Sequence, residues 1–132
     1  MHFSEGMAAV SKGAKWGFVD STGKEAIPFE YEEAFCFTDG LALVYKNHRY
    51  GFIDKAGKIV IPFVYENASS YTEGLAAVGR KGTYGFIDTK GNEVIPFRYA
   101  YAVSFADGQA KVSRGGKWWY IDKNGKETPA DR

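Results

Sequence analysis

The side chains best suited to catalysis in this sequence are four aspartates that recur at one fixed interval. Each stands three residues before a glycine, and the pairs are Asp20 with Gly23, Asp54 with Gly57, Asp88 with Gly91 and Asp122 with Gly125. A catalytic pair of carboxylates would have to break this symmetry. We therefore interpret the aspartates as turn residues whose carboxylates bond the backbone, with the glycines taking positive φ.

Residues for other chemistry are isolated. His2 lies at the N-terminus and His48 in a short polar loop, and neither has a Cys, His or Asp at metal-ligand spacing. The single cysteine, Cys36, lacks a partner to activate it as a nucleophile, and it rules out an internal disulfide. No Gly-Lys-Ser or Gly-Lys-Thr phosphate loop occurs. We expect a protein that is not an enzyme and uses no metal and no cofactor.

Cations gather in four short polar segments, each of which carries at least two of them. The pairs are Lys12 and Lys15, Lys46 and Arg49, Arg80 and Lys81, and Arg114 and Lys117. If the segments lie in phase, they form a basic ridge that would bind a phosphorylated ligand, a nucleotide or an acidic protein surface. Solvated loop tips explain the same residues. A second, acidic ridge would consist of Glu5, Asp39, Glu73 and Asp107.

Aromatic residues also recur in register, at Trp16, Tyr50, Tyr84 and Trp118. An exposed ladder of such rings could stack sugars or bases, whereas a buried ladder would form the core between successive repeats. We favour the core. Trp119 stands where the other repeats have glycine, and we expect it to enter a groove or to cap the last sheet. The candidate ligand-binding residues are Lys15, Lys46, Arg49, Arg80, Lys81, Arg114, Lys117, Trp118 and Trp119.

A repeat of 34 residues positions all of these side chains. The string Phe3-Ser4-Glu5-Gly6 returns at residues 37–40, 71–74 and 105–108 without insertion or deletion. The chain is thus a single repeat domain with units 3–36, 37–70 and 71–104 and a partial capping unit at 105–132. Its structural signature comprises Trp16, Gly17, Asp20 and Gly23; Tyr50, Gly51, Asp54 and Gly57; Tyr84, Gly85, Asp88 and Gly91; and Asp122 and Gly125.

Each repeat reads as three short antiparallel strands. In the second repeat these are the β-branched and aromatic runs Leu41–Tyr45, Tyr50–Ile53 and Ile59–Tyr65. Gly and Pro interrupt the chain too often for a helical pattern. Pro62 removes a backbone donor, so the third strand is expected to be an edge strand or a bulged one. The fold class predicted is all-β.

The fourth repeat lacks the Ile-Pro-Phe segment, so we expect it to lack the third strand. It also carries Gln109 and Lys111 where earlier repeats have apolar residues, as a polar terminal cap would. A closed ring would need equal numbers of each strand. We favour an open stack of repeats, with a small closed propeller-like ring as the alternative.

The repeated motifs resemble one known family. Gly-Leu-Ala-x-Val, Lys-Trp-Gly-Phe-Val-Asp-x-x-Gly-Lys and Ile-Pro-Phe-x-Tyr are similar to the WG repeat, also called KWG. In the first repeat the resemblance rests on Lys15, Trp16, Gly17, Phe18, Asp20, Gly23, Ile27, Pro28 and Tyr31. Tyr50 and Tyr84 replace the tryptophan and Trp119 replaces the glycine. The resemblance implies a mostly bacterial, β-rich interaction module without a shared enzymatic activity.

Composition sets the remaining bounds. The chain has 132 residues and a formal net charge of +1, so no bulk excess of charge points to nucleic acid or an anionic membrane. No apolar run approaches the roughly 20 residues of a membrane-spanning helix, and no secretion signal is visible. We expect a cytoplasmic monomer or weak homodimer.

We expect a non-catalytic module that mediates protein–protein interaction. Binding of a small anionic ligand or nucleotide at the basic ridge, or of a carbohydrate at an aromatic platform, is the alternative. A nucleic acid or membrane partner is not expected.

Overall fold

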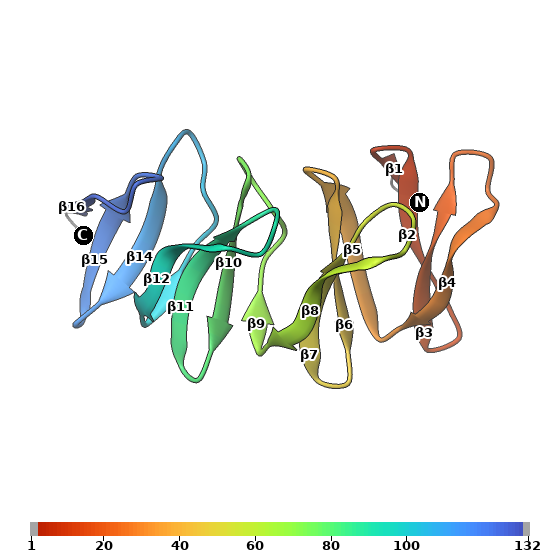
Figure 1. Ribbon diagram of the computed structural model, residues 1–132, viewed down its shortest axis with the longest axis horizontal. Helices are drawn as coiled ribbons and strands as arrows, with labels where there is room; N and C mark the ends of the chain where they lie inside the picture. Colours follow the sequence, from red (N-terminus) through yellow and green to blue (C-terminus); the bar gives the residue numbers. More distant parts are fainter. Residues whose placement is uncertain (1–2, 131–132) are drawn as a thin grey trace. The chain divides into compact units, whose positions relative to one another are not determined.

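The computed structural model describes residues 3–130, which form strands and turns without a helix (Figure 1). The predicted all-β repeat fold is confirmed. Within these residues, sixteen strands build four antiparallel sheets of four strands each, and strands that follow one another in the chain are neighbours in the sheet. None of the sheets in this part of the chain closes into a barrel.

The strands of the first sheet are β1 (Phe3–Ser4), β2 (Met7–Lys12), β3 (Lys15–Asp20) and β4 (Glu25–Tyr31). Those of the second are β5 (Glu33–Thr38), β6 (Leu41–Lys46), β7 (Arg49–Ile53) and β8 (Ile59–Tyr65). The third sheet contains β9 (Asn67–Ala68), β10 (Leu75–Arg80), β11 (Thr83–Asp88) and β12 (Glu93–Tyr99). The fourth contains β13 (Tyr101–Ala102), β14 (Ala110–Arg114), β15 (Lys117–Ile121) and β16 (Glu127–Pro129).

Two details differ from the sequence prediction. Each sheet has a fourth, leading strand in place of the three strands expected per repeat. In the first, third and fourth sheets this strand is only two residues long, at β1, β9 and β13, too short for a sequence pattern. The last repeat also keeps its third strand as β16, because pairing with β15 needs only backbone donors and acceptors.

The chain divides into two compact units, Met1–Tyr65 and Glu66–Arg132, here called the N-terminal and C-terminal units. Each contains two sheets whose apolar faces pack together. In the N-terminal core, Phe18 meets Phe37 edge-on with ring centroids 5.0 Å apart. The equivalent rings of the C-terminal core, Phe86 and Phe105, are 4.9 Å apart. The same contact between phenylalanines of successive repeats thus forms the core of both units.

The glycine that follows the signature aromatic is required by the third strand of the sheet. Trp16 pairs with Tyr31 but Phe18 pairs with Ile27, so residues 28–30 bulge over Gly17. A Cβ on Gly17 would lie 2.7 Å from the Ile27 carbonyl oxygen, and the Phe29 ring packs above it. The second and third sheets repeat this bulge. The prediction of a bulged third strand is confirmed.

Trp119 can replace that glycine because the fourth sheet has no such bulge. Its partners run in regular register, from Trp119 with Pro129 to Ile121 with Glu127. The indole packs against the C-terminal core, on the side where the other repeats place a phenylalanine ring over the glycine. Trp119 therefore packs on the core-facing side of the last sheet and does not project into an open groove.

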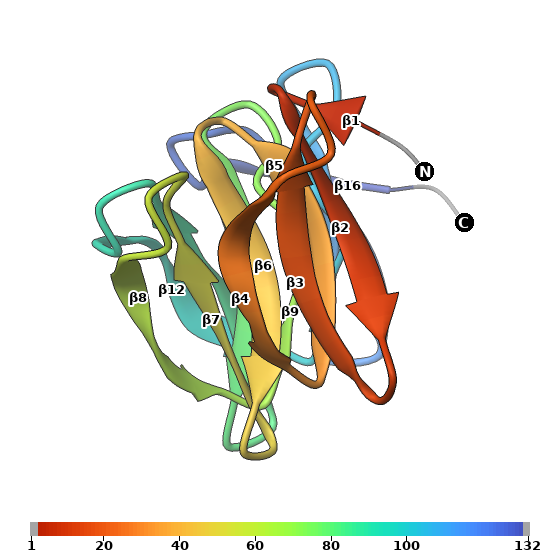
Figure 2. The same cartoon turned by 90° about the vertical axis from the view of Figure 1, so that its right-hand side faces the viewer.

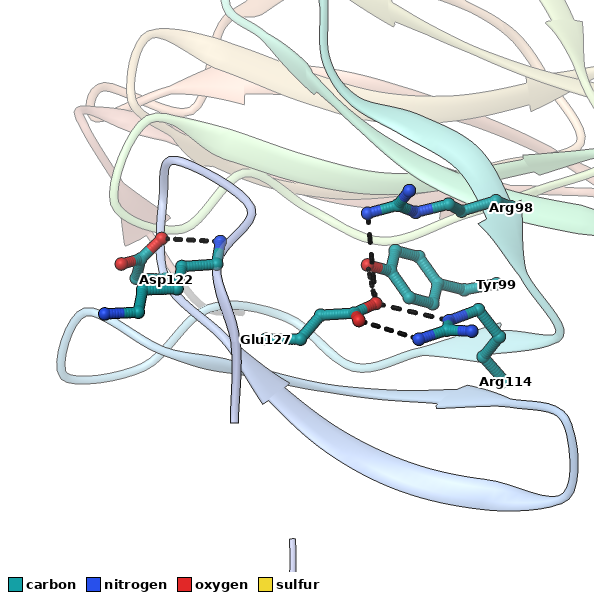
Figure 3. Close-up of polar contacts among 6 residues, drawn as sticks. Arg98, Tyr99, Arg114, Asp122 and Glu127 are labelled. Atoms are coloured by element: carbon teal, nitrogen blue, oxygen red, sulfur yellow. Dashed lines mark hydrogen bonds and ion pairs between the residues drawn. The ribbon is translucent and has the colours of Figure 1, made fainter. Parts of the chain in front are cut away.

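The short strand β16 is held in place by one carboxylate (Figure 3). Glu127 accepts hydrogen bonds from Tyr99 Oη at 2.7 Å and from Arg114 Nε and Nη2 at 3.2 and 2.7 Å. Arg98 Nη2 lies 3.9 Å from the same group. The hydrogen bonds from Arg114 and Tyr99 hold the pKa of Glu127 below its usual 4.5. The carboxylate thus ties β16 to β12 and β14.

We predict that Gly85→Ala destabilises the C-terminal unit by about 2–3 kcal/mol, because the new Cβ would overlap a backbone oxygen that cannot move alone. That oxygen, of Ile95, would lie 2.6 Å away. Gly79→Ala in the neighbouring strand is the matched control, since the atom nearest to its Cβ belongs to the Tyr84 side chain, at 3.1 Å, and not to the backbone. Urea unfolding should separate the two variants. Equal losses would contradict the role of the bulge.

A second prediction concerns Glu127→Gln, which should cost about 1–2 kcal/mol at neutral pH by weakening charge-assisted hydrogen bonds. A carboxylate with a depressed folded pKa stabilises the protein above its unfolded pKa, and this stability is lost as the pH falls through the folded value. Wild-type stability should therefore fall more steeply than that of the variant below about pH 4.5. Glu93→Gln, at the same position one repeat earlier, is the control and should leave the wild-type pH dependence of unfolding intact.

Candidate functional site

The four repeated aspartates are turn residues, as the sequence predicts. Asp88 Oδ1 accepts hydrogen bonds from the backbone N–H groups of Lys90 and Asn92, both at 2.9 Å. Asp20, Asp54 and Asp122 make the same pair of contacts two and four residues ahead. The bond from Asn92 holds the pKa of Asp88 below its usual value, and Thr22 does so for Asp20. These carboxylates are committed to the backbone as acceptors.

The acidic ridge is used to join neighbouring sheets inside each unit. Glu5 Oε1 accepts from Gly40 N at 3.1 Å and lies 3.3 Å from Lys55 Nζ. Two repeats later, Glu73 Oε1 accepts from Gly108 N at 3.0 Å and lies 3.4 Å from Lys123 Nζ. The Gly108 N–H lowers the pKa of Glu73. These two glutamates therefore act as clamps between repeats.

The predicted basic segments are tight hairpin turns. In the turns after β6 and β14 both central residues have positive φ, at Asn47 and His48 and at Gly115 and Gly116. This is the geometry of a type I′ turn. Within each unit the two hairpin turns lie at the same end of the packed sheets (Figures 1 and 2). The structure thus brings the cations of two successive repeats to one end of each unit.

Like charges face each other across three of these hairpins. The last strand pairs before the turns are Lys12 with Lys15, Lys46 with Arg49, and Arg114 with Lys117. Like charges directly opposite in an antiparallel pair are destabilising. In the remaining hairpin Arg80 pairs with Thr83, and Lys81 enters the turn itself. The arrangement therefore does not maximise stability at the turns.

The cations differ in how far the chain itself neutralises them. Arg114 is bound to Glu127, and Lys46 lies 3.9 Å from Glu30. The Arg80 guanidinium stands 4.2 Å above the Phe97 ring. Lys15, Arg49, Arg80, Lys81 and Lys117 are solvent-exposed. The chain thus neutralises Arg114 and pairs Lys46 with an acidic side chain, whereas Lys15, Lys81 and Lys117 carry their charges at exposed positions.

An aromatic platform covers the outer face of the last sheet. Trp118 is 38% exposed, Tyr120 39% and Tyr101 50%. The Lys111 ammonium lies 5.2 Å from the Trp118 ring, and the Tyr101 ring is 6.4 Å from it. Sequence reasoning identified Trp118 but missed the two tyrosines. Tyr120 could have been found, because it replaces a phenylalanine that is fully buried in the other three repeats.

The signature aromatics of the N-terminal and C-terminal cores are partly buried. Trp16 and Tyr84 pack against the core of their own unit, as the core interpretation expects. Trp119 is also partly buried, beneath the Arg114 guanidinium at 5.1 Å. Its position makes it a support for the platform and not a part of its surface.

Other candidate chemistry is sparse in residues 3–130. This part of the chain contains no group of three or more His, Cys, Asp or Glu side chains that could hold a metal ion. It also contains no helix long and apolar enough to cross a membrane. Cys36 is a free, half-buried thiol, and His48 is exposed in its turn. His2 lies outside the described residues.

Comparison with one solved structure shows similarity of fold. The structure titled "KlHsv2 with loop 6CD replaced by a Gly-Ser linker" matches 96% of this chain with a TM-score of 0.57 and 10% sequence identity. The match spans 48% of that protein, so this chain corresponds to about half its length. A 2S albumin seed protein from Dolichos matches 99% of this chain and 91% of its own at 14% identity, with a TM-score of 0.37.

Sequence comparison defines the family. No curated protein matches the chain. The family described as WG containing repeat matches residues 1–16, 16–48, 50–83 and 84–118, in four successive segments. These segments contain the signature aromatics, the glycines beneath the bulged strands and the first three turn aspartates. The chain therefore belongs to the WG repeat family.

Proposed function

We propose that the protein is a non-catalytic interaction module that binds an acidic surface of a partner protein through its basic hairpin turns. The observation that carries the proposal is the set of cation pairs that face each other across the turns, such as Lys12 with Lys15. Each such pair costs a few tenths of a kcal/mol to about 1 kcal/mol. A binding partner that supplies carboxylates would remove this repulsion.

The local geometry supports a macromolecular partner more than a small ligand. The exposed cations lie at the tips of hairpins in both units, whereas a small-molecule site is concave and surrounds its ligand. Exposed charges of this kind accelerate association and are screened by salt. We therefore propose contacts whose strength falls as ionic strength rises. Small anions remain an outcome of the test.

A carbohydrate is the second candidate ligand, favoured by the exposed rings of Trp118, Tyr120 and Tyr101. Aromatic faces stack on sugar rings, and Lys111 stands beside Trp118 as a hydrogen-bond donor. This platform belongs to the C-terminal unit. It would bind independently of the basic turns.

The proposal predicts that the triple variant Lys15→Glu, Arg49→Glu, Lys117→Glu loses binding of a fluorescent polyglutamate peptide by about tenfold or more at low salt. Each change turns a like-charge pair into an opposite-charge pair, so the fold should be kept or strengthened. Anisotropy titrations over a salt series would measure affinity and salt dependence. ATP and a soluble oligosaccharide should be titrated in parallel.

The matched control is Lys24→Glu, Lys58→Glu, Lys126→Glu, which changes the net charge equally at exposed sites by the Asp-x-x-Gly turns. It should bind the peptide within about twofold of wild type if the hairpin turns form the site. Equal losses in both triples would reduce the effect to net charge. If the wild-type protein does not bind polyglutamate at low salt, the proposal is refuted. If the protein binds the oligosaccharide and Trp118→Ala abolishes that binding, the platform is favoured.

A further inference from the structure

One pocket in the N-terminal unit is lined by both charged and aromatic residues. Its volume is about 390 Å³, and it is lined by Trp16, Glu32, Glu33, Ala34 and Phe35. Trp16 belongs to β3 of the first sheet, and the other four stand where the chain enters β5 of the second. The size lies in the range of small-ligand pockets, and Phe35 is 40% exposed at its rim.

Trp16 differs from its counterparts in the other repeats by its surroundings. Tyr50 has the Tyr45 ring 4.6 Å away, Tyr84 has Tyr101 at 5.3 Å, and Trp118 has the Lys111 ammonium at 5.2 Å. Within residues 3–130, no ring and no cation stacks on Trp16. A signature ring of the N-terminal unit thus faces the pocket without a stacking partner.

The carboxylates of the two glutamates that line the pocket also have no bonding partner in the described residues. In the described part of the chain, neither Glu32 nor Glu33 makes a side-chain hydrogen bond or an ion pair. The backbone N–H of Glu32 bonds to Tyr45 O at 2.9 Å, which fixes the start of β5. Lys46 pairs with Glu30 instead. Burial, and then the negative charge of Glu33, raise the pKa of Tyr50.

The C-terminal unit shows that the repeat does not need this pocket. The positions two repeats later are Tyr84, Ala100, Tyr101, Ala102 and Val103. There Tyr101 replaces Glu33 and its ring packs edge-on against Tyr84. The same local fold is therefore made with no carboxylate and with the aromatic covered. Glu33 is therefore not a requirement of the repeat, since Asn67 and Tyr101 stand at its position; Glu32 recurs as Glu66 in the second repeat.

We infer that this pocket binds an arginine side chain of a partner protein. A guanidinium is planar, stacks on an aromatic face and pairs with carboxylates through two parallel hydrogen bonds, which matches Trp16 beside Glu32 and Glu33. The chain already stacks guanidinium groups on its own rings, with Arg80 4.2 Å from Phe97 and Arg114 5.1 Å from Trp119. The site is separate from the basic turns and stands whether or not they bind an acidic partner.

The test is an NMR titration of the ¹⁵N-labelled chain with three short peptides of sequence Gly-Gly-X-Gly-Gly. X is arginine, lysine or citrulline, which keeps the shape of arginine without its charge. The arginine peptide should shift the Trp16 indole N–H signal while those of Trp118 and Trp119 stay in place. The citrulline and lysine peptides should bind at least about tenfold and about threefold more weakly, respectively.

Two variants separate the site from general charge. Glu33→Tyr copies the residue that fills this place in the C-terminal unit, so the fold should tolerate it, and arginine binding should be lost. Glu32→Gln with Glu33→Gln should weaken binding about tenfold, whereas Glu25→Gln, an exposed carboxylate of the same unit, should leave it unchanged. If the arginine peptide does not shift the Trp16 indole N–H signal, the inference is overturned. Equal binding of citrulline or lysine, or full binding by a folded Glu33→Tyr, would overturn it as well.

Discussion

The close crossing of a bulged strand over a bare glycine is the constraint on which the other features of the first three repeats depend. A side chain on Gly51 would place its Cβ 2.7 Å from the Ile61 carbonyl oxygen, so only glycine lets β8 cross there. The crossing lays the Phe63 ring over the glycine, from where it stacks with Tyr31 of the first sheet at 6.3 Å. One missing side chain thus sets both the bend of a sheet and the packing between two sheets.

The sequence was sufficient to predict the features that local chemistry determines. The period, the all-β class, the Asp-x-x-Gly turns and the irregular third strand follow from Gly, Pro and Asp at fixed positions. The leading strands and β16 were missed because backbone pairing defines them. Asn67–Ala68 carries no β-branched residue, and Glu127–Pro129 lacks the Ile-Pro-Phe pattern. Such strands exist because a neighbouring strand offers them partners.

The sequence predicted where the charged residues recur, but it did not predict which partners they bind. Glu5 and Glu73 formed part of an expected acidic ridge, yet each bonds a backbone N–H of the next repeat. Arg114 was a candidate for ligand binding, yet Glu127 neutralises it from a strand that the sequence did not predict. A periodic pattern shows which residues share a position. It does not show which of them find a partner within the chain, because that partner can lie in a different repeat.

A near-perfect repeat makes its own departures informative, since each position is compared with copies in the same fold. Where a departure is explained by local packing, as at Trp119 with its regular strand register, no further role is needed. Glu33 has no such explanation, because Tyr101 occupies the same place and completes an aromatic contact there. With Glu33 at this place, the N-terminal unit has no ring stacked on Trp16 and has a negative charge beside it. A position that forgoes an available packing contact and leaves a carboxylate unpaired is the pattern expected where binding, and not stability, determines the residue.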